Sequence, residues 1–99
     1  MEVIQLIDFS KETMDLVSTF YARESDILKV QVSQDDTVLV EGTLVNDDFN
    51  SLNGIKDSNF AIVNPITQKG IYTFDINGLE KIKVTKEKED TILTIVGVS

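Results

Sequence analysis

The stretch from Gly70 to Val98 constrains the fold of this 99-residue chain more than any other segment. Apolar and polar residues alternate along Tyr72–Ile76 and again along Lys81–Val84, as they do in strands that bury one face. The dipeptide Asn77-Gly78 between these segments is typical of a tight turn. A third apolar run, Ile92–Val98, ends the stretch. These residues predict three successive β-strands, and they carry no evident chemistry.

The same alternation recurs earlier in the chain. Leu28–Val32 and Val38–Val40 are expected strands, and Gln34-Asp35-Asp36 between them suits a hairpin connection. Phe60–Val63 is an expected short strand that ends before Pro65, because proline cannot donate a ladder hydrogen bond. Strands at intervals of about 8–12 residues, separated by turn residues, predict a sandwich. We therefore expect an all-β fold: a single-domain antiparallel β-sandwich of jelly-roll type over residues 1–99.

The amino-terminal segment is compatible with more than one structure. Glu2–Phe9 has apolar residues on both faces, which suits a strand that is buried or covered by a partner. Residues 10–22 fit a helix, because Met14, Val17 and Tyr21 follow helical spacing. They also fit a strand, because β-branched and aromatic residues are frequent there. The strand is the favoured interpretation.

The predicted core consists of apolar residues that share the inward phase of the expected strands. They are Val3, Leu6, Leu16, Phe20, Leu28, Val30, Val32, Val38, Val40, Phe60, Ile62, Tyr72, Phe74, Ile76, Ile82, Val84, Ile92 and Val96. The longest polar segment, residues 46–59, is expected to be pinned to this core by Phe49, Leu52 and Ile55. Gly42 is expected at a bulge or at a close approach of the backbone.

The net charge of −8 limits the partners of the chain. Residues 1–50 hold eleven acidic and three basic side chains, whereas residues 51–99 hold six of each. A nucleic-acid-binding protein needs a basic footprint, so neither DNA nor RNA is an expected partner. The apolar runs span only a few residues, so no membrane partner is expected, and no basic segment of a signal peptide is evident. The acidic half suits either a soluble, unpaired surface or a match to a basic partner.

Groups for catalysis and metal binding are sparse. The chain has no cysteine and no histidine, which removes the usual activated nucleophiles and the commonest metal ligand. Carboxylates are numerous enough for chance pairs and no pair stands out, so no catalytic residue is expected and the chain is not predicted to be an enzyme. Asp47, Asp48 and Asn50 form a loose set of oxygen ligands without the spacing of a calcium loop. No metal site and no cofactor is therefore expected.

A carbohydrate site on a β-sandwich would need an exposed aromatic ring. The chain has no tryptophan and two tyrosines. Tyr72 is in phase with the predicted core, which leaves Tyr21 as the candidate ligand aromatic.

Two segments are candidates for contact with another subunit. Ile92–Val98 and Glu2–Phe9 are apolar on both faces, and such a strand is either central in the sandwich or covered by a partner. The candidate contact residues are Val3, Ile4, Ile7, Leu93 and Ile95. A homo-oligomer would cover such a strand, and a central position in the sandwich would do so equally well.

The order and spacing of four phrases resembles a small β-sandwich module found in accessory structural proteins of tailed bacteriophages. The phrases are Val40-Glu-Gly-Thr43, Ser51-Leu-Asn-Gly54, the alternating stretch Gly70–Val84 and the closing Thr94-Ile-Val-Gly97. Modules of this kind occur in head-decoration, head-fibre, tail and baseplate components, and similar sandwiches occur in carbohydrate-binding modules. The resemblance covers residues 27–98 and departs at the charged run 86–90, where such modules carry small polar residues.

The resemblance implies a non-enzymatic structural protein of the virion, a decoration or accessory subunit of a phage head or tail. Residues 1–26 would then be the attachment segment, and the partners would be further copies of the chain and other virion proteins. The protein would be made in the host cytoplasm and located in the virion. Two alternatives stay open: a carbohydrate-binding module that recognises the host surface, and an acidic inhibitor that mimics nucleic acid.

Overall fold

The computed structural model describes residues 7–22 and 24–99, which form two β-sheets. No helix occurs in these residues, and so none that could cross a membrane. The strands within them are β1 (Ile7–Thr13), β2 (Val17–Tyr21), β3 (Ile27–Val32), β4 (Val38–Thr43), β5 (Asn50–Ser51), β6 (Gly54–Lys56), β7 (Ile62–Val63), β8 (Gly70–Asp75), β9 (Lys81–Lys86) and β10 (Leu93–Val98). Each strand runs antiparallel to the strands it pairs with. The predicted all-β, antiparallel fold is confirmed.

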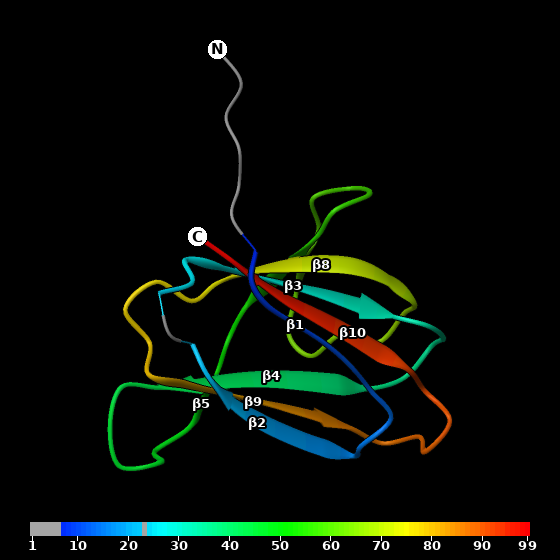
Figure 1. The fold of residues 1–99 in the computed structure, drawn as a ribbon. Helices are drawn as coiled ribbons and strands as arrows, with labels where there is room; N and C mark the ends of the chain where they lie inside the picture. Colours follow the sequence, from blue (N-terminus) through cyan, green and yellow to red (C-terminus); the bar gives the residue numbers. More distant parts are fainter. Residues whose placement is uncertain (1–6, 23) are drawn as a thin grey trace.

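The two sheets stack as layers of a sandwich (Figure 1). Sheet A has the order β1-β10-β3-β8-β6-β7, and sheet B has the order β2-β9-β4-β5. With the hairpin β6–β7 set aside, the chain forms nested pairs: β4 with β5 innermost, then β3 with β8, β2 with β9, and β1 with β10 outermost. Pairing of β10 with β3 and of β9 with β4 rolls this nested hairpin into two sheets. This is the strand arrangement of a jelly roll, into which the hairpin β6–β7 is inserted at one edge.

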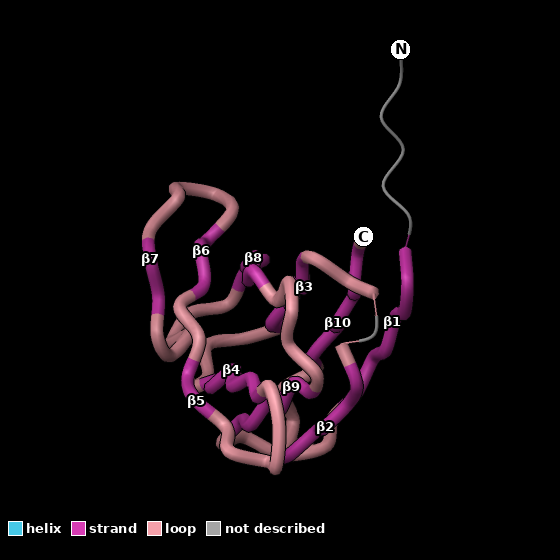
Figure 2. The backbone as a smooth tube through the Cα atoms, turned by 90° about the vertical axis from the view of Figure 1, so that its left-hand side faces the viewer, coloured by secondary structure: helices cyan, strands magenta, loops and turns pink. Residues whose placement is uncertain are grey.

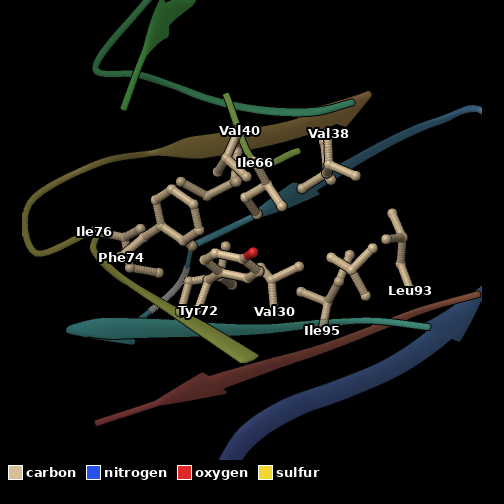
Figure 3. Packing of buried hydrophobic residues seen from close by; sticks show 14 residues of the cluster. Val30, Val38, Val40, Ile66, Tyr72, Phe74, Ile76, Leu93 and Ile95 are labelled. Carbon is tan, nitrogen blue, oxygen red and sulfur yellow. The ribbon is translucent and has the colours of Figure 1, made fainter. Parts of the chain in front are cut away.

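The core lies between the two sheets (Figure 3). The largest fully buried side chains are Tyr72, Phe74, Leu28, Ile66, Ile76, Ile82, Leu93, Ile95, Val30, Val38, Val40 and Val84. Burial of each such side chain stabilises the fold by roughly 1.5–3 kcal/mol. The hydroxyl of Tyr72 donates a hydrogen bond of 2.6 Å to the carbonyl of Gln68, so the one polar atom of this side chain has a partner. Burial of the ring raises the pKa of Tyr72. Most of the predicted core from residue 28 to residue 84 is therefore confirmed.

Residues 10–22 form strands, as favoured from their composition, but they contribute to both sheets. β1 ends at Thr13 and β2 begins at Val17, so the chain passes from sheet A to sheet B within three residues. Phe20 packs against the core and lies 5.1 Å from Phe9, measured between ring centroids. Leu16 is 43 % exposed because it lies in the crossing, and its prediction as a core residue is wrong. The predicted core residues Val3 and Leu6 lie outside the described residues.

The phase of β10 is opposite to the predicted one. Leu93 and Ile95 are fully buried, whereas the predicted core residues Ile92 and Val96 are only partly buried. The register explains the difference, because Ile95 pairs with the buried Val30 of β3. Directly paired residues point to the same side of a sheet, so alternate residues of β10 follow the phase of β3.

The predicted core residues Phe60 and Ile62 are 80 % and 74 % exposed, so this prediction is wrong. Ile62 pairs with Ile55, and Ile55 pairs with Thr73 of β8, which places Ile62 on the outer face of sheet A. Phe60 lies in the turn between β6 and β7 with a φ of 60°. The tip of this hairpin reaches away from sheet B (Figures 1 and 2). No layer of the sandwich covers these side chains.

The charged hairpin tip after β9 is held by a buried carboxylate. Asp36 is 4 % exposed, and it accepts hydrogen bonds from the backbone N–H groups of Glu87 at 3.3 Å and Lys88 at 3.1 Å. The ammonium of Lys86 donates to the carbonyls of Lys88 at 2.7 Å and Glu89 at 3.0 Å. Burial raises the pKa of Asp36, and the hydrogen bonds it accepts lower it further than burial raises it. The net pKa lies below the ordinary value for an aspartate.

We expect Asp36→Asn to lower the free energy of unfolding at pH 7 by about 1–3 kcal/mol, the usual contribution of hydrogen bonds to a charged acceptor. Because the pKa of Asp36 is lower in the folded state, its stabilising effect is complete above pH of about 4 and is lost as the pH falls below that value. Urea unfolding of both proteins from pH 7 down to pH 2.5 measures this difference. Glu87→Gln is the control and should change stability little. A difference that stays constant down to pH 2.5 would contradict the role of the carboxylate charge.

We expect Gly97→Ala to lower the free energy of unfolding by about 1–3 kcal/mol, because overpacking displaces well-packed neighbours. A Cβ atom at position 97 would overlap the ring of Phe9 and lie 2.6 Å from the hydroxyl oxygen of Ser25. Chemical denaturation of a double-mutant cycle with Phe9→Leu measures the coupling. The cost of Gly97→Ala should fall when the ring is absent, and an unchanged cost would exclude the ring as its cause.

Candidate interaction surface

The described residues form no cluster of the kind that holds a metal ion. No group of three or more histidine, cysteine, aspartate or glutamate residues lies close enough to hold a metal ion in this part of the chain. In the loop between β4 and β5, the carboxylate of Asp47 accepts from Lys81 at 2.7 Å, and the amide of Asn50 donates to the carbonyl of Asp48 at 3.1 Å. These contacts shape a loop in which Asn46 and Asp47 have positive φ angles of 60° and 55°.

Three of the five predicted subunit-contact residues, Ile7, Leu93 and Ile95, lie in the described part of the chain. Val3 and Ile4 lie outside the described residues. Ile7 begins β1 and is 68 % exposed, so it is accessible to a partner. Leu93 and Ile95 have no exposed surface, because the register of β10 turns them into the core. These two side chains are therefore not available for contact with a second subunit in this fold.

Tyr21 lies at the end of β2 on the outer face of sheet B and is 59 % exposed. The ammonium of Lys81 lies over its ring, 5.5 Å from the centroid, and also binds Asp47. This hydrogen bond with Asp47 raises the pKa of Lys81. Lys83 lies over the ring of Phe49 in the same way, at 4.7 Å. A sugar that stacked on the Tyr21 ring would therefore bind to a ring that already contacts the ammonium group of Lys81.

The hairpin β6–β7 carries an apolar surface that the sequence pattern does not reveal. Ile55, Phe60 and Ile62 are between 44 % and 80 % exposed, and Ile71 of the neighbouring β8 is 44 % exposed. Alternation shows that a strand has two different faces, but it does not show which face meets another layer. Ile55 was therefore expected to anchor its loop to the core, and the structure shows it on the outer face instead. Of the other two predicted anchors, Leu52 packs against the core and Phe49 is partly buried.

A polar network ties the hairpin tip to the outer face of sheet A. The carboxylate of Asp57 accepts hydrogen bonds from Lys29 of β3 at 2.9 Å and from the hydroxyl of Thr73 of β8 at 2.6 Å. Lys29 also donates to Thr73 at 2.7 Å. Partial burial raises the pKa of Asp57, and these bonds lower it to a net value below the ordinary one. The network neutralises the charge of Lys29 and fixes the base of the hairpin tip.

Beside this network, the outer face of sheet A has an open depression of about 440 Å³. Ile27, Ile55 and Thr73 contribute to its lining, which is completed by the exposed polar residues Asp26, Asn53, Asp75 and Asn77. Register places these residues together, because Ile27 pairs with Asp75 and Ile55 pairs with Thr73. The depression therefore combines isoleucine side chains with two carboxylates. We refer to it as the sheet A groove.

A second depression, of about 460 Å³, lies at the end of β4. Gly42, Leu52 and Leu79 line it together with the loop that follows β4. The close approach expected at Gly42 is confirmed, since a Cβ atom there would lie 2.5 Å from Leu79 and 3.3 Å from Leu52. The loop residues Leu44 and Val45 are exposed beside it. This depression carries one carboxylate, that of Asp48, in its lining.

Comparison with known proteins supports the fold. No protein-family model and no curated protein matches this sequence. Among solved structures, the chain is similar to the SPBc2 prophage-derived protein YomS, with a TM-score of 0.72 and 16 % sequence identity. That likeness covers 100 % of this chain and 98 % of YomS.

The chain is also similar to the PBSX exported protein XepA, with a TM-score of 0.78 and 15 % sequence identity. It is covered completely in this comparison and spans 40 % of the XepA chain, so XepA contains more than this fold. At these identities the likeness establishes a shared architecture. Both of these structural neighbours are phage-derived proteins.

Proposed function

We propose that this chain is a phage-associated structural protein without enzymatic activity. The observation that carries the proposal is the fold shared with the prophage-derived YomS over 98 % of that protein. The resemblance of residues 27–98 to phage accessory modules points in the same direction. The described surface supports a role in protein contacts, because it carries exposed apolar side chains.

The finer form of the proposal is a decoration or tail-associated subunit in the virion. Such a subunit acts by contacts with its own copies and with other virion proteins. Symmetric particles favour proteins that assemble around a symmetry axis, so we expect a homo-oligomer with a trimer as the first candidate. Among the predicted subunit-contact residues that the structure describes, Ile7 is the accessible one. In this form of the proposal, the acidic surface keeps the protein soluble and contributes to the selection of its partners.

A carbohydrate-binding module is the second candidate function, and the exposure of Tyr21 is the observation that favours it. Recognition of host-surface sugar would place this ring against the apolar face of a sugar. Lys81 lies over this ring and binds Asp47, so these two polar side chains lie beside it and could hydrogen-bond to sugar hydroxyl groups. Binding to a panel of host-surface glycans, lost in Tyr21→Ala, would favour this function over the structural one.

We expect the purified chain to form one oligomer of defined mass at micromolar concentrations, measured by light scattering behind a sizing column. Ile7→Ser should weaken this oligomer, because it removes an exposed apolar contact of roughly 1–2 kcal/mol. Leu44→Ser is the matched control, since Leu44 is similarly exposed, at 63 % against 68 % for Ile7, in a loop of a different sheet.

The place of the protein in the virion is tested separately. An antibody against the chain should label purified phage particles. It should also detect the chain among the proteins of these particles after they are separated on a gel. Absence from purified particles, together with a monomer at every concentration, would overturn the structural proposal. An oligomer that is absent from particles would keep the self-assembly and overturn the virion location.

A further inference from the structure

We propose that the sheet A groove is a docking site for a segment of a partner protein in which basic residues alternate with apolar ones. The proposal deepens the structural role proposed above, on which its biological context rests. All residues that line the groove belong to the described part of the chain. It unites an apolar floor, an unmatched negative charge and a wall formed by the hairpin β6–β7.

The apolar floor is open to a partner. Ile55 is 44 % exposed and lies in the groove beside the partly buried Ile27. The cross-strand pair of Ile55 with Ile62 continues this apolar surface onto β7, at the free edge of sheet A. Ile62 is 74 % exposed. Apolar side chains of a partner could therefore cover a continuous strip from the groove to the edge of the sheet.

The charge of the groove selects the partner. Asp26 and Asp75 are exposed, and neither forms an ion pair within the described part of the chain. Lys29 of β3, which pairs with the groove residue Thr73 of β8, is already bound to Asp57 and Thr73. The groove thus presents two carboxylates with no basic side chain in its lining. Lysine or arginine side chains of a partner would match this charge, and an acidic segment would be repelled.

The hairpin gives the groove a fixed wall. Its tip rises on the outer side of sheet A (Figures 1 and 2), and the Lys29–Asp57–Thr73 network holds the base of the tip against the sheet. On the groove side, the amide of Asn64 donates to the side-chain oxygen of Asn53 at 3.1 Å, so Asn53 is held in place as well. A groove with fixed walls favours binding, because little conformational freedom is lost when the partner docks.

The test uses the full chain and three synthetic hexapeptides with blocked ends. The first is Leu-Arg-Ile-Lys-Leu-Arg. The second replaces its basic residues by glutamate, and the third replaces its apolar residues by serine. Titration is followed by the NMR signals of the backbone amides. We expect the first peptide to give saturable shifts at Ile27, Ile55, Thr73 and Asp75, and we expect the other two to bind at least several-fold more weakly.

Two sets of variants, each with a matched control, locate the residues that contribute to binding. Asp26→Asn and Asp75→Asn should each weaken the first peptide about two- to fivefold, as expected for an exposed ion pair. Asparagine at position 75 can still accept the hydrogen bond that Asp75 accepts from the amide of Asn77 at 3.0 Å, so the local turn is kept. Asp15→Asn removes the same charge from the opposite end of the sandwich and should leave the affinity unchanged. Ile55→Ser should weaken binding roughly fivefold, and Leu44→Ser should not.

Three results would overturn the proposal. One is a set of shifts that spread over the acidic surface without saturation, and another is equal loss of affinity in Asp15→Asn and Asp75→Asn. The third is a change in the groove signals with protein concentration alone, which would show that a second copy of the chain occupies the groove. The peptides are titrated into the isolated chain. Failure of the basic peptide to bind the groove is therefore distinguishable from absence of the protein from phage particles.

Discussion

The pairing of β3 with both β10 and β8 determines which side chains sheet A buries. Once Leu28 and Val30 face sheet B, the register obliges their partners in both neighbouring strands to face the same way. Tyr72 and Phe74 thereby enter the core from one side of β3, and Ile95 enters from the other. The same constraint sends the intervening residues outward. The outer surface of sheet A is therefore a consequence of how the core is packed.

Sequence periodicity predicts those strands well in which the apolar residues occupy one face. Val30, Tyr72 and Phe74 could be assigned to the core because each alternates with polar neighbours. The inward face of β10 could not be assigned in this way, because Ile95 and Val96 place apolar side chains on opposite faces of the strand. Only the long-range partner decides between the two phases, and that partner lies more than sixty residues away in the sequence. Local pattern contains no information about it.

The candidate site was harder to predict than the fold, for a related reason. Phe60 and Ile62 have the composition of core residues, and their exposure follows from the position of β6 and β7 at an edge that a jelly roll does not require. Asp26 and Asp75 are separated by 49 positions and meet only because β3 and β8 are paired. Charge counts indicate an acidic protein, whereas the strand register shows where two of these carboxylates lie together without an ion pair to any described residue.

The insertion of the hairpin between β5 and β8 has a consequence for how such a protein can change. The nested pairs of the roll close without β6 and β7, and the tip between these two strands, residues 58–61, is exposed throughout. Gly54 of β6 and Val63 of β7 pack against the core, so the constraint of packing ends at the strands and does not extend to the tip. Substitutions in the tip can therefore change the outer surface of sheet A without changing the layers that form the core. The same property makes the tip between β6 and β7 a natural place to graft a foreign epitope for display.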